Sequence, residues 1–198
     1  MKISKGWITV IIVALVVIIL FSWGKGTYNK LVSNEETVSQ QWANVENVYQ
    51  RRSDLIPNLV NTVKGVANFE KQTLTDVIEA RAKATSVQIN PKNLDEVSLQ
   101  KFQAAQDNLG SALSRLMVTV EAYPQLKATQ NFSELQAQLE GTENRIAVER
   151  MKFNEVAKAY NTYRRSFPSN IFAGIFGFGE KAYFTATAGA EKAPQVQF

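Results

Sequence analysis

The chain has 198 residues, of which 45% are hydrophobic and 20% are charged, and it carries a net charge of +4 with no cysteine and no histidine. The missing cysteine excludes disulfides and thiolate sites, and the missing histidine removes the commonest general base and metal ligand. Serine–histidine and cysteine–histidine catalysis are therefore excluded. The only tight basic pairs are Arg51-Arg52 and Arg164-Arg165, so we expect no nucleic-acid-binding face.

An apolar segment over residues 7–23 predicts a transmembrane helix. It has tryptophan at both ends and no charge between them. As a helix it would span roughly 25 Å, close to the ~30 Å hydrocarbon layer of a bilayer. A secretory signal is the alternative, but its apolar core is typically ~7–15 residues long and is followed by a small-x-small cleavage site, which Ser22-Trp23-Gly24 matches poorly. We expect an uncleaved, single-pass anchor.

Lysines flank the segment on both sides, so the basic-residue rule barely discriminates between the two orientations. The very short N-terminal tail favours an inside N-terminus and an exported domain. We expect the domain to be extracytoplasmic.

Four amphipathic segments follow the anchor, each with apolar residues at alternating steps of three and four. Their apolar stripes cover residues 31–49, 59–81, 102–123 and 135–167. Ser53 and Asp54 offer an N-cap, and Pro57 lacks an N–H and clashes one turn back, so we predict a turn at 53–56. The third segment is expected to be capped by Asn93 and the fourth by Asn131 or Ser133.

Four such helices predict an all-α fold, an antiparallel four-helix bundle behind a single transmembrane helix. The alternative is one kinked helix through Pro57, which would be about 85 Å long against partners of ~45–50 Å and would leave apolar surface uncovered. We therefore expect three parts: a tail and anchor at 1–26, the bundle at 27–167, and an apolar tail with glycine and phenylalanine at 168–198.

The C-terminal tail contains an apolar run at 171–178. This run is too short to span a bilayer and too apolar to stand free in water. Because the tail follows a returning helix, it begins near the bilayer. It either folds back over the open end of the bundle or lies in the lipid interface as a second membrane contact.

Charged residues fall on or beside the apolar stripes. They are Glu35, Glu70, Arg81 and Glu149, with Arg150 adjacent. An unpaired buried charge costs several kcal/mol, so we expect paired networks or stripe-edge positions with the charged heads in water. A cation-binding carboxylate cluster is the alternative. Its ligands would be Glu35, Glu70, Glu143 and Glu149.

Several segments together resemble the LemA family of bacterial membrane proteins. The match is densest in Arg51-Arg52-Ser53-Asp54-Leu55-Ile56-Pro57-Asn58-Leu59-Val60-Asn61-Thr62-Val63-Lys64. It resumes at Tyr123-Pro124-Gln125-Leu126-Lys127 and at Leu139-Glu140-Gly141-Thr142-Glu143-Asn144-Arg145-Ile146. The resemblance implies an N-terminally anchored antiparallel helical bundle in the bacterial cell membrane, without enzymatic activity. It also implies a scaffold or accessory role for envelope proteins.

Polar side chains gather in the first of these segments. They are Arg51, Arg52, Asp54, Asn58, Asn61 and Lys64. With a turn at 53–56 they would lie at the end of the bundle farthest from the membrane. They either satisfy backbone groups at that turn or form a docking surface for another protein, and we take them as the candidate partner-binding residues.

The expected function is that of a membrane-tethered, non-enzymatic interaction module. Its expected partners are a membrane or envelope protein and, through residues 7–23, the lipid bilayer. We expect no catalytic residue, cofactor or metal. The alternatives are a lipid-surface protein that uses the phenylalanine-rich tail and a cation-binding bundle.

Overall fold

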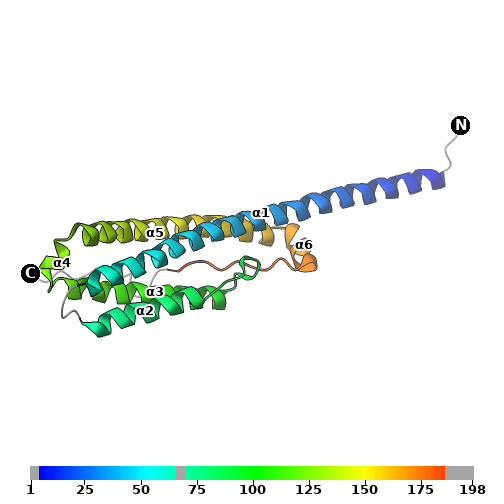
Figure 1. Cartoon of the computed structure of the whole chain (residues 1–198). Coiled ribbons are helices and arrows are strands. Elements are labelled where there is room, and N and C mark those ends of the chain that lie inside the picture. Colours follow the sequence, from blue (N-terminus) through cyan, green and yellow to red (C-terminus); the bar gives the residue numbers. More distant parts are fainter. Residues whose placement is uncertain (1–4, 66–69, 186–198) are drawn as a thin grey trace, which may run out of the picture.

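The structure, a computed structural model, describes residues 5–65 and 70–185, and the described residues are helical with no strand. The predicted all-α class is confirmed. The elements are α1 (Lys5–Lys64), α2 (Lys71–Ser86), the 3₁₀ helix η1 (Pro91–Asn93), α3 (Glu96–Val120), α4 (Pro124–Lys127), α5 (Gln130–Arg165) and α6 (Ser169–Phe176) (Figure 1).

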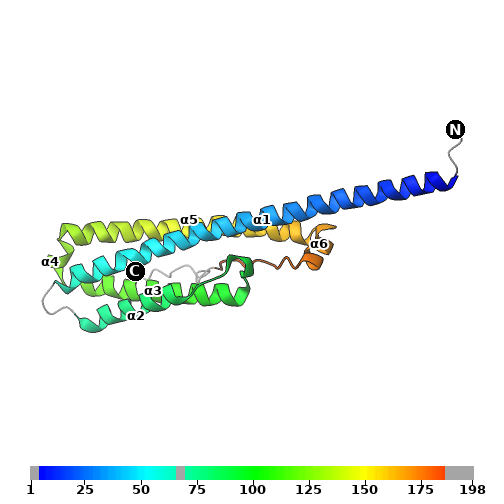
Figure 2. The same cartoon turned by 45° about the vertical axis from the view of Figure 1, so that its right-hand side comes forward.

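Helix α1 organises the molecule. Its N-terminal part projects alone, and its second half packs along α5 and contacts α2, while α2 packs on α3 (Figures 1 and 2). The chain then runs back and forth through α2, α3 and α5, and α6 lies beside α1 where it leaves the domain. Among the described residues, α1 is the one helix long and apolar enough to cross a membrane, by length and composition.

The predicted turn at 53–56 is wrong, because α1 continues through Pro57 to Lys64. The alternative, a helix through Pro57, is correct on this point, although α1 ends at Lys64 and α2 is a separate helix. Proline removes the donor for the carbonyl four residues earlier, and Arg81 Nε supplies a replacement at 2.8 Å from Ser53 O. Beyond the proline, Leu59 and Val63 are fully buried, and this burial favours continuing the helix.

Two predicted helix caps are also wrong. Helix α3 is capped by Asp95, whose Oδ1 accepts a hydrogen bond from Ser98 N at 2.8 Å. That backbone N–H holds the pKa of the Asp95 carboxyl below its ordinary value. Helix α5 begins at Gln130 with Thr129 in the N-cap position, so Asn131 and Ser133 both lie inside the helix and neither caps it. A local preference for Asn and Asp identified the region of each cap but not the residue.

Within the part of the chain that the structure describes, the buried apolar side chains form two clusters. One centres on Trp42, whose ring contacts those of Phe102, Phe153 and Phe184 with centroids 5.2 to 6.0 Å apart. The other lies between α1, α2, α3 and α5, towards the end of α1. Trp42 and Phe153 are fully buried, as their positions on apolar stripes predict.

The described part of the C-terminal tail folds back into the domain. Gly177 adopts a left-handed conformation, with φ of +74°, and ends α6. Residues 178–185 then run as an extended segment along α5, with Phe178, Lys181 and Phe184 buried. The rest of the tail, 186–198, lies outside the described residues.

Two asparagines of α5 satisfy the backbone of this extended segment. Asn161 Nδ2 donates to Lys181 O at 2.7 Å, and Lys181 N donates to Asn161 Oδ1 at 3.0 Å. Asn154 makes the same two-way pair with the backbone of Phe184, at 2.9 Å in each direction. Because a buried backbone without partners is costly, these asparagines allow the extended segment to form part of a helical core.

Candidate interaction surface

The six residues singled out in the sequence do not form one surface. Arg51, Asp54, Asn58 and Asn61 recur at steps of three, four and three along α1 and are exposed, as is Lys64 in its last turn. Because this spacing follows one helix face, the five side chains form a polar stripe, which we call the α1 stripe. It lies on the outer side of a continuous helix and not at a turn.

Arg52 points the other way. Its side chain is 4% exposed, and Nη1 lies 2.9 Å from Glu143 Oε2 on α5. Nη2 donates to Gln106 Oε1 on α3 at 2.6 Å, and the guanidinium lies 5.1 Å from the ring centroid of Tyr49. Arg52 therefore connects α1, α3 and α5, and its guanidinium makes its contacts inside the domain.

A small hollow adjoins the α1 stripe. It is a cavity of about 220 Å³ between α1 and α2, where Pro57, Asn61 and Lys64 face Ile78 and Arg81. Ile78 is exposed there. Polar side chains beside an exposed apolar residue are typical of the rim and centre of a transient protein interface.

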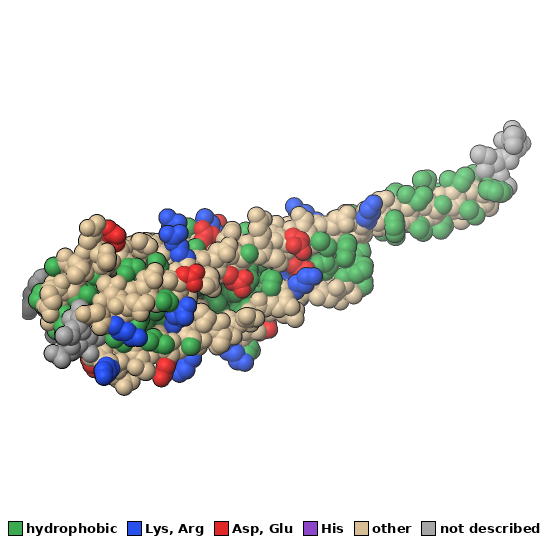
Figure 3. All heavy atoms as spheres, in the orientation of Figure 1, with side chains coloured by type: hydrophobic (Ala, Val, Ile, Leu, Met, Phe, Trp, Pro, Cys, Tyr) green, Lys and Arg blue, Asp and Glu red, His purple; other side chains and the backbone are tan. Residues whose placement is uncertain are grey.

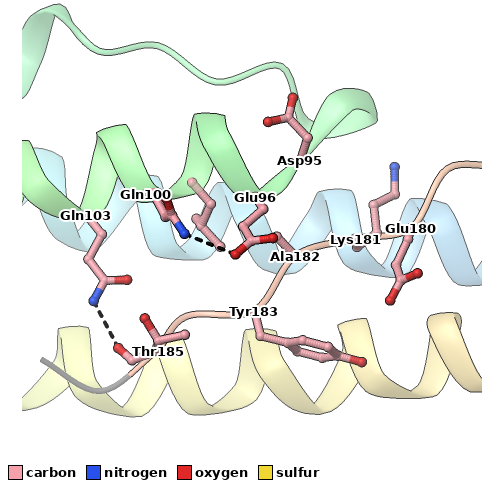
Figure 4. Close-up of a pocket in the computed structure, with 10 residues that line it drawn as sticks. Asp95, Glu96, Gln100, Gln103, Glu180, Lys181, Ala182, Tyr183 and Thr185 are labelled. Atoms are coloured by element: carbon pink, nitrogen blue, oxygen red, sulfur yellow. Dashed lines mark hydrogen bonds between the residues drawn. The ribbon is translucent and has the colours of Figure 1, made fainter. Parts of the chain in front are cut away.

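A second cavity, of about 510 Å³, lies between the start of α3 and the extended segment (Figure 4). Gln103 Nε2 donates to Thr185 O at 2.9 Å, and Gln100 Nε2 to Glu96 Oε1 at 3.0 Å, as Figure 4 shows. Asp95, Glu96 and Glu180 contribute acidic groups to its wall. The sequence did not indicate this cavity, because half of its lining comes from the tail.

Lys181 is a buried cation that sequence reasoning missed. Its side chain is 1% exposed, and Nζ lies 2.8 Å from Glu35 Oε1 and 2.6 Å from the carbonyl oxygen of Lys92. Tyr160 lies beside this pair, and burial, with the nearby Glu35 carboxylate, raises the pKa of its hydroxyl to about 12. The ion pair connects α1, η1 and the extended segment.

Four of the five charged residues predicted on or beside the apolar stripes have partners in the structure. Glu35 pairs with Lys181 and Glu149 with Lys152, and Arg81 bonds to the Ser53 carbonyl. The bonds from Lys152 and Gln41 hold the pKa of the Glu149 carboxyl below its ordinary value. Glu70 is exposed at the N-cap of α2 and not on a stripe. Within 5–65 and 70–185, no group of three or more acidic side chains is arranged to hold a metal ion.

Comparison with known proteins decides the family. The family model described as the LemA family matches residues 41–198. This chain belongs to the LemA family. The match confirms the resemblance seen in the sequence, and it includes the α1 stripe, Arg52 and the whole helical domain beyond the first forty residues.

Curated proteins similar to this LemA-family chain include magnetosome proteins and a LemA protein. It is 28% identical over 174 residues to "Magnetosome protein MamQ 2" of Paramagnetospirillum magneticum, covering 79% of this chain and 64% of the relative. The same figures hold for "Magnetosome protein MamQ" of Magnetospirillum gryphiswaldense. It is 22% identical over 162 residues to "Protein LemA" of Metamycoplasma hominis, covering 82% of this chain and 70% of the relative. The chain thus spans less than two thirds of the length of the two magnetosome proteins.

Proposed function

We propose that this LemA-family chain is a single-pass, non-enzymatic scaffold of the bacterial cell membrane that presents the α1 stripe to a membrane or envelope protein. Residues 7–23 anchor it, and the helical domain lies on the extracytoplasmic side. The second half of α1 forms an antiparallel four-helix bundle with α2, α3 and α5. The absence of histidine and cysteine from the sequence supports a role without catalysis.

The observation that carries this proposal is the continuity of α1. Its apolar residues 7–23 are exposed, and apolar surface on this scale needs lipid. The same helix, without a break at residue 26, carries the α1 stripe. At 1.5 Å per residue, Arg51 lies about 42 Å along the axis from Trp23. A partner on the stripe would therefore be held at a set distance from the bilayer.

The extended segment belongs with the bundle in this proposal. The sequence-based boundary between bundle and tail at 167/168 separates α5 from Phe178, Lys181 and Phe184, which are buried against it. We therefore assign residues up to Thr185 to the bundle.

Site-specific photocrosslinking in the native membrane tests the docking surface. A photoreactive residue at Asn58 or Asn61 should give a discrete crosslinked protein, and the same residue at exposed Ser111 on α3 should not. Reversing two stripe charges, R51E with D54K, should abolish the product. The absence of any product along the stripe, with products at Ser111, would contradict the proposed site.

A thiol probe tests the orientation, because the chain has no cysteine of its own. Asn58→Cys should react with a membrane-impermeant maleimide in intact cells. Reaction only after lysis would place the domain on the cytoplasmic side.

A further inference from the structure

Helix α6 leaves an apolar face uncovered at the base of the domain. Ile175 is 70% exposed, Ile171 and Phe176 are about half exposed, and Phe167 just before the helix is 82% exposed. No charged residue occurs between Arg165 and Glu180. Figure 3 shows hydrophobic surface at this base, next to the narrow apolar helix that leaves the domain. A cluster of large apolar side chains this exposed needs a further apolar partner.

The position of α6 relative to the anchor indicates its depth. The ring of Phe172 meets that of Trp23 edge-on, with centroids 5.7 Å apart. The rings of Phe176 and Phe178 contact Tyr28 at 4.9 and 5.8 Å. Tryptophan and tyrosine at the end of a spanning segment lie at the lipid–water boundary. Since α6 packs against both, it lies at that boundary too.

A groove joins α6 to the anchor. It is a cavity of about 310 Å³ lined by Leu20, Phe21, Gly24, Lys25 and Tyr28 of α1 and by Phe172 and Phe176 of α6. Gly24 permits the close approach, since a Cβ there would lie 3.1 Å from the Phe172 ring. Leu20 and Phe21 also belong to the exposed apolar surface of residues 7–23. The groove is therefore continuous with the surface that meets lipid.

Exposed cations flank this apolar base. Lys25 and Lys30 follow the anchor on α1, and Arg165 ends α5 just before α6. Cations near a membrane surface are attracted to anionic headgroups. Apolar side chains with a basic border are typical of a helix that lies in the interface.

We propose that α6 is an interfacial helix, with Ile171, Ile175 and Phe176 in the outer acyl region of the bilayer and a lipid acyl chain in the groove between α6 and α1. This inference rests on the anchoring role of residues 7–23 given above. The turn at Gly177 then returns the chain to the domain, so α6 enters the interface as a short loop between α5 and the extended segment. The domain has two contacts with the membrane, and they restrict its tilt about the anchor.

Depth-dependent fluorescence quenching tests this proposal on the full chain. Flotation cannot, because the anchor alone retains every variant in a vesicle. An environment-sensitive dye is attached to Ile175→Cys, and the chain is placed in vesicles of equal parts phosphatidylcholine and phosphatidylglycerol. The quencher is a spin label on the lipid, near either the headgroup end or the methyl end of the acyl chains. Val118→Cys, 67% exposed on α3, is the matched apolar control, and Val16→Cys reports insertion of the anchor.

The expected result is several-fold stronger quenching at Ile175 than at Val118, greatest with the spin label near the headgroup, while Val16 is quenched best by the deep label. Strong quenching of the dye at Ile175 by aqueous iodide, while the dye at Val16 is still quenched best by the deep spin label, would overturn the interfacial helix. It would leave the anchor intact. A blue-shifted Ile175 dye that no spin-labelled lipid quenches would show that protein covers α6, which also overturns the proposal. Loss of quenching at Val16 would overturn both the anchor and this inference.

Discussion

Arg81 donates a hydrogen bond from Nε to the carbonyl oxygen of Ser53 at 2.8 Å, and this is the carbonyl that Pro57 leaves without a helical donor. The side chain of α2 thus supplies the bond that α1 lacks. A proline inside a helix costs about 3 kcal/mol through the lost bond and the ring clash. The contact reduces this cost and ties the second helix to the first at the same point.

A double-mutant cycle tests this replacement. In the parent chain, Arg81→Met should cost about 1.5–3 kcal/mol, the usual range for a hydrogen bond to a charged group. In a Pro57→Ala background the alanine N–H can bond to Ser53 O, so the same change should cost distinctly less. Chemical denaturation of the chain without residues 1–26 measures both values. Equal costs in the two backgrounds would show that Arg81 does not substitute for the missing donor.

The two neighbouring arginines should behave differently. Arg52→Gln should destabilise the domain by about 1–3 kcal/mol, because the buried Gln106 loses its partner and the contact with Glu143 is lost. Arg51→Gln should change stability by about 0.5 kcal/mol or less, since its side chain faces solvent. Thermal melts of the two single variants give the comparison. Similar losses for both would mean that Arg51 has a structural partner as well.

The extended segment should contribute to the core as much as a helix does. Phe184→Ala should cost about 3–5 kcal/mol, because a ring that is 6% exposed and packed on Trp42 and Phe153 leaves a cavity. Phe167→Ala is the matched control, with the same chemistry at 82% exposure, and in the chain without residues 1–26 it should change stability by about 0.5 kcal/mol or less. If the two variants unfold at the same denaturant concentration, the segment does not pack as described.

Tyr160 should make the domain sensitive to alkaline pH. Its pKa is raised from the ordinary value of 10.0 to about 12 by burial and by Glu35. Between pH 10 and pH 12 the unfolded state releases the Tyr160 proton, while the folded state keeps it. The folding free energy linked to Tyr160 is therefore complete below pH 10 and is lost as the pH rises towards 12. Tyr160→Phe should show a smaller loss of stability over that window. An unchanged pH slope in the variant would assign the alkaline loss to other groups.

Local patterns in the sequence were sufficient to predict the helical class, an apolar segment of membrane length and the burial of Trp42 and Phe153. Trp42 and Phe153 lie on apolar stripes whose spacing matches the period of a helix, and this spacing can be read from the local sequence. Helix boundaries were less predictable. The turn expected near Pro57 was wrong, because the replacement donor for the Ser53 carbonyl is on Arg81, in another helix and 28 residues from Ser53.

The sequence by itself determined that this LemA-family chain is helical and has one apolar segment of membrane length, because both depend on short-range periodicity and composition. Only the tertiary structure decided that Arg52 points inward while Arg51 points outward. It also decided that Asn154 and Asn161 bond an extended tail into the core. Those outcomes depend on pairings across 20 to 91 residues. A buried polar group is stable only where the fold places a hydrogen-bonding partner beside it, and no local sequence pattern specifies that partner.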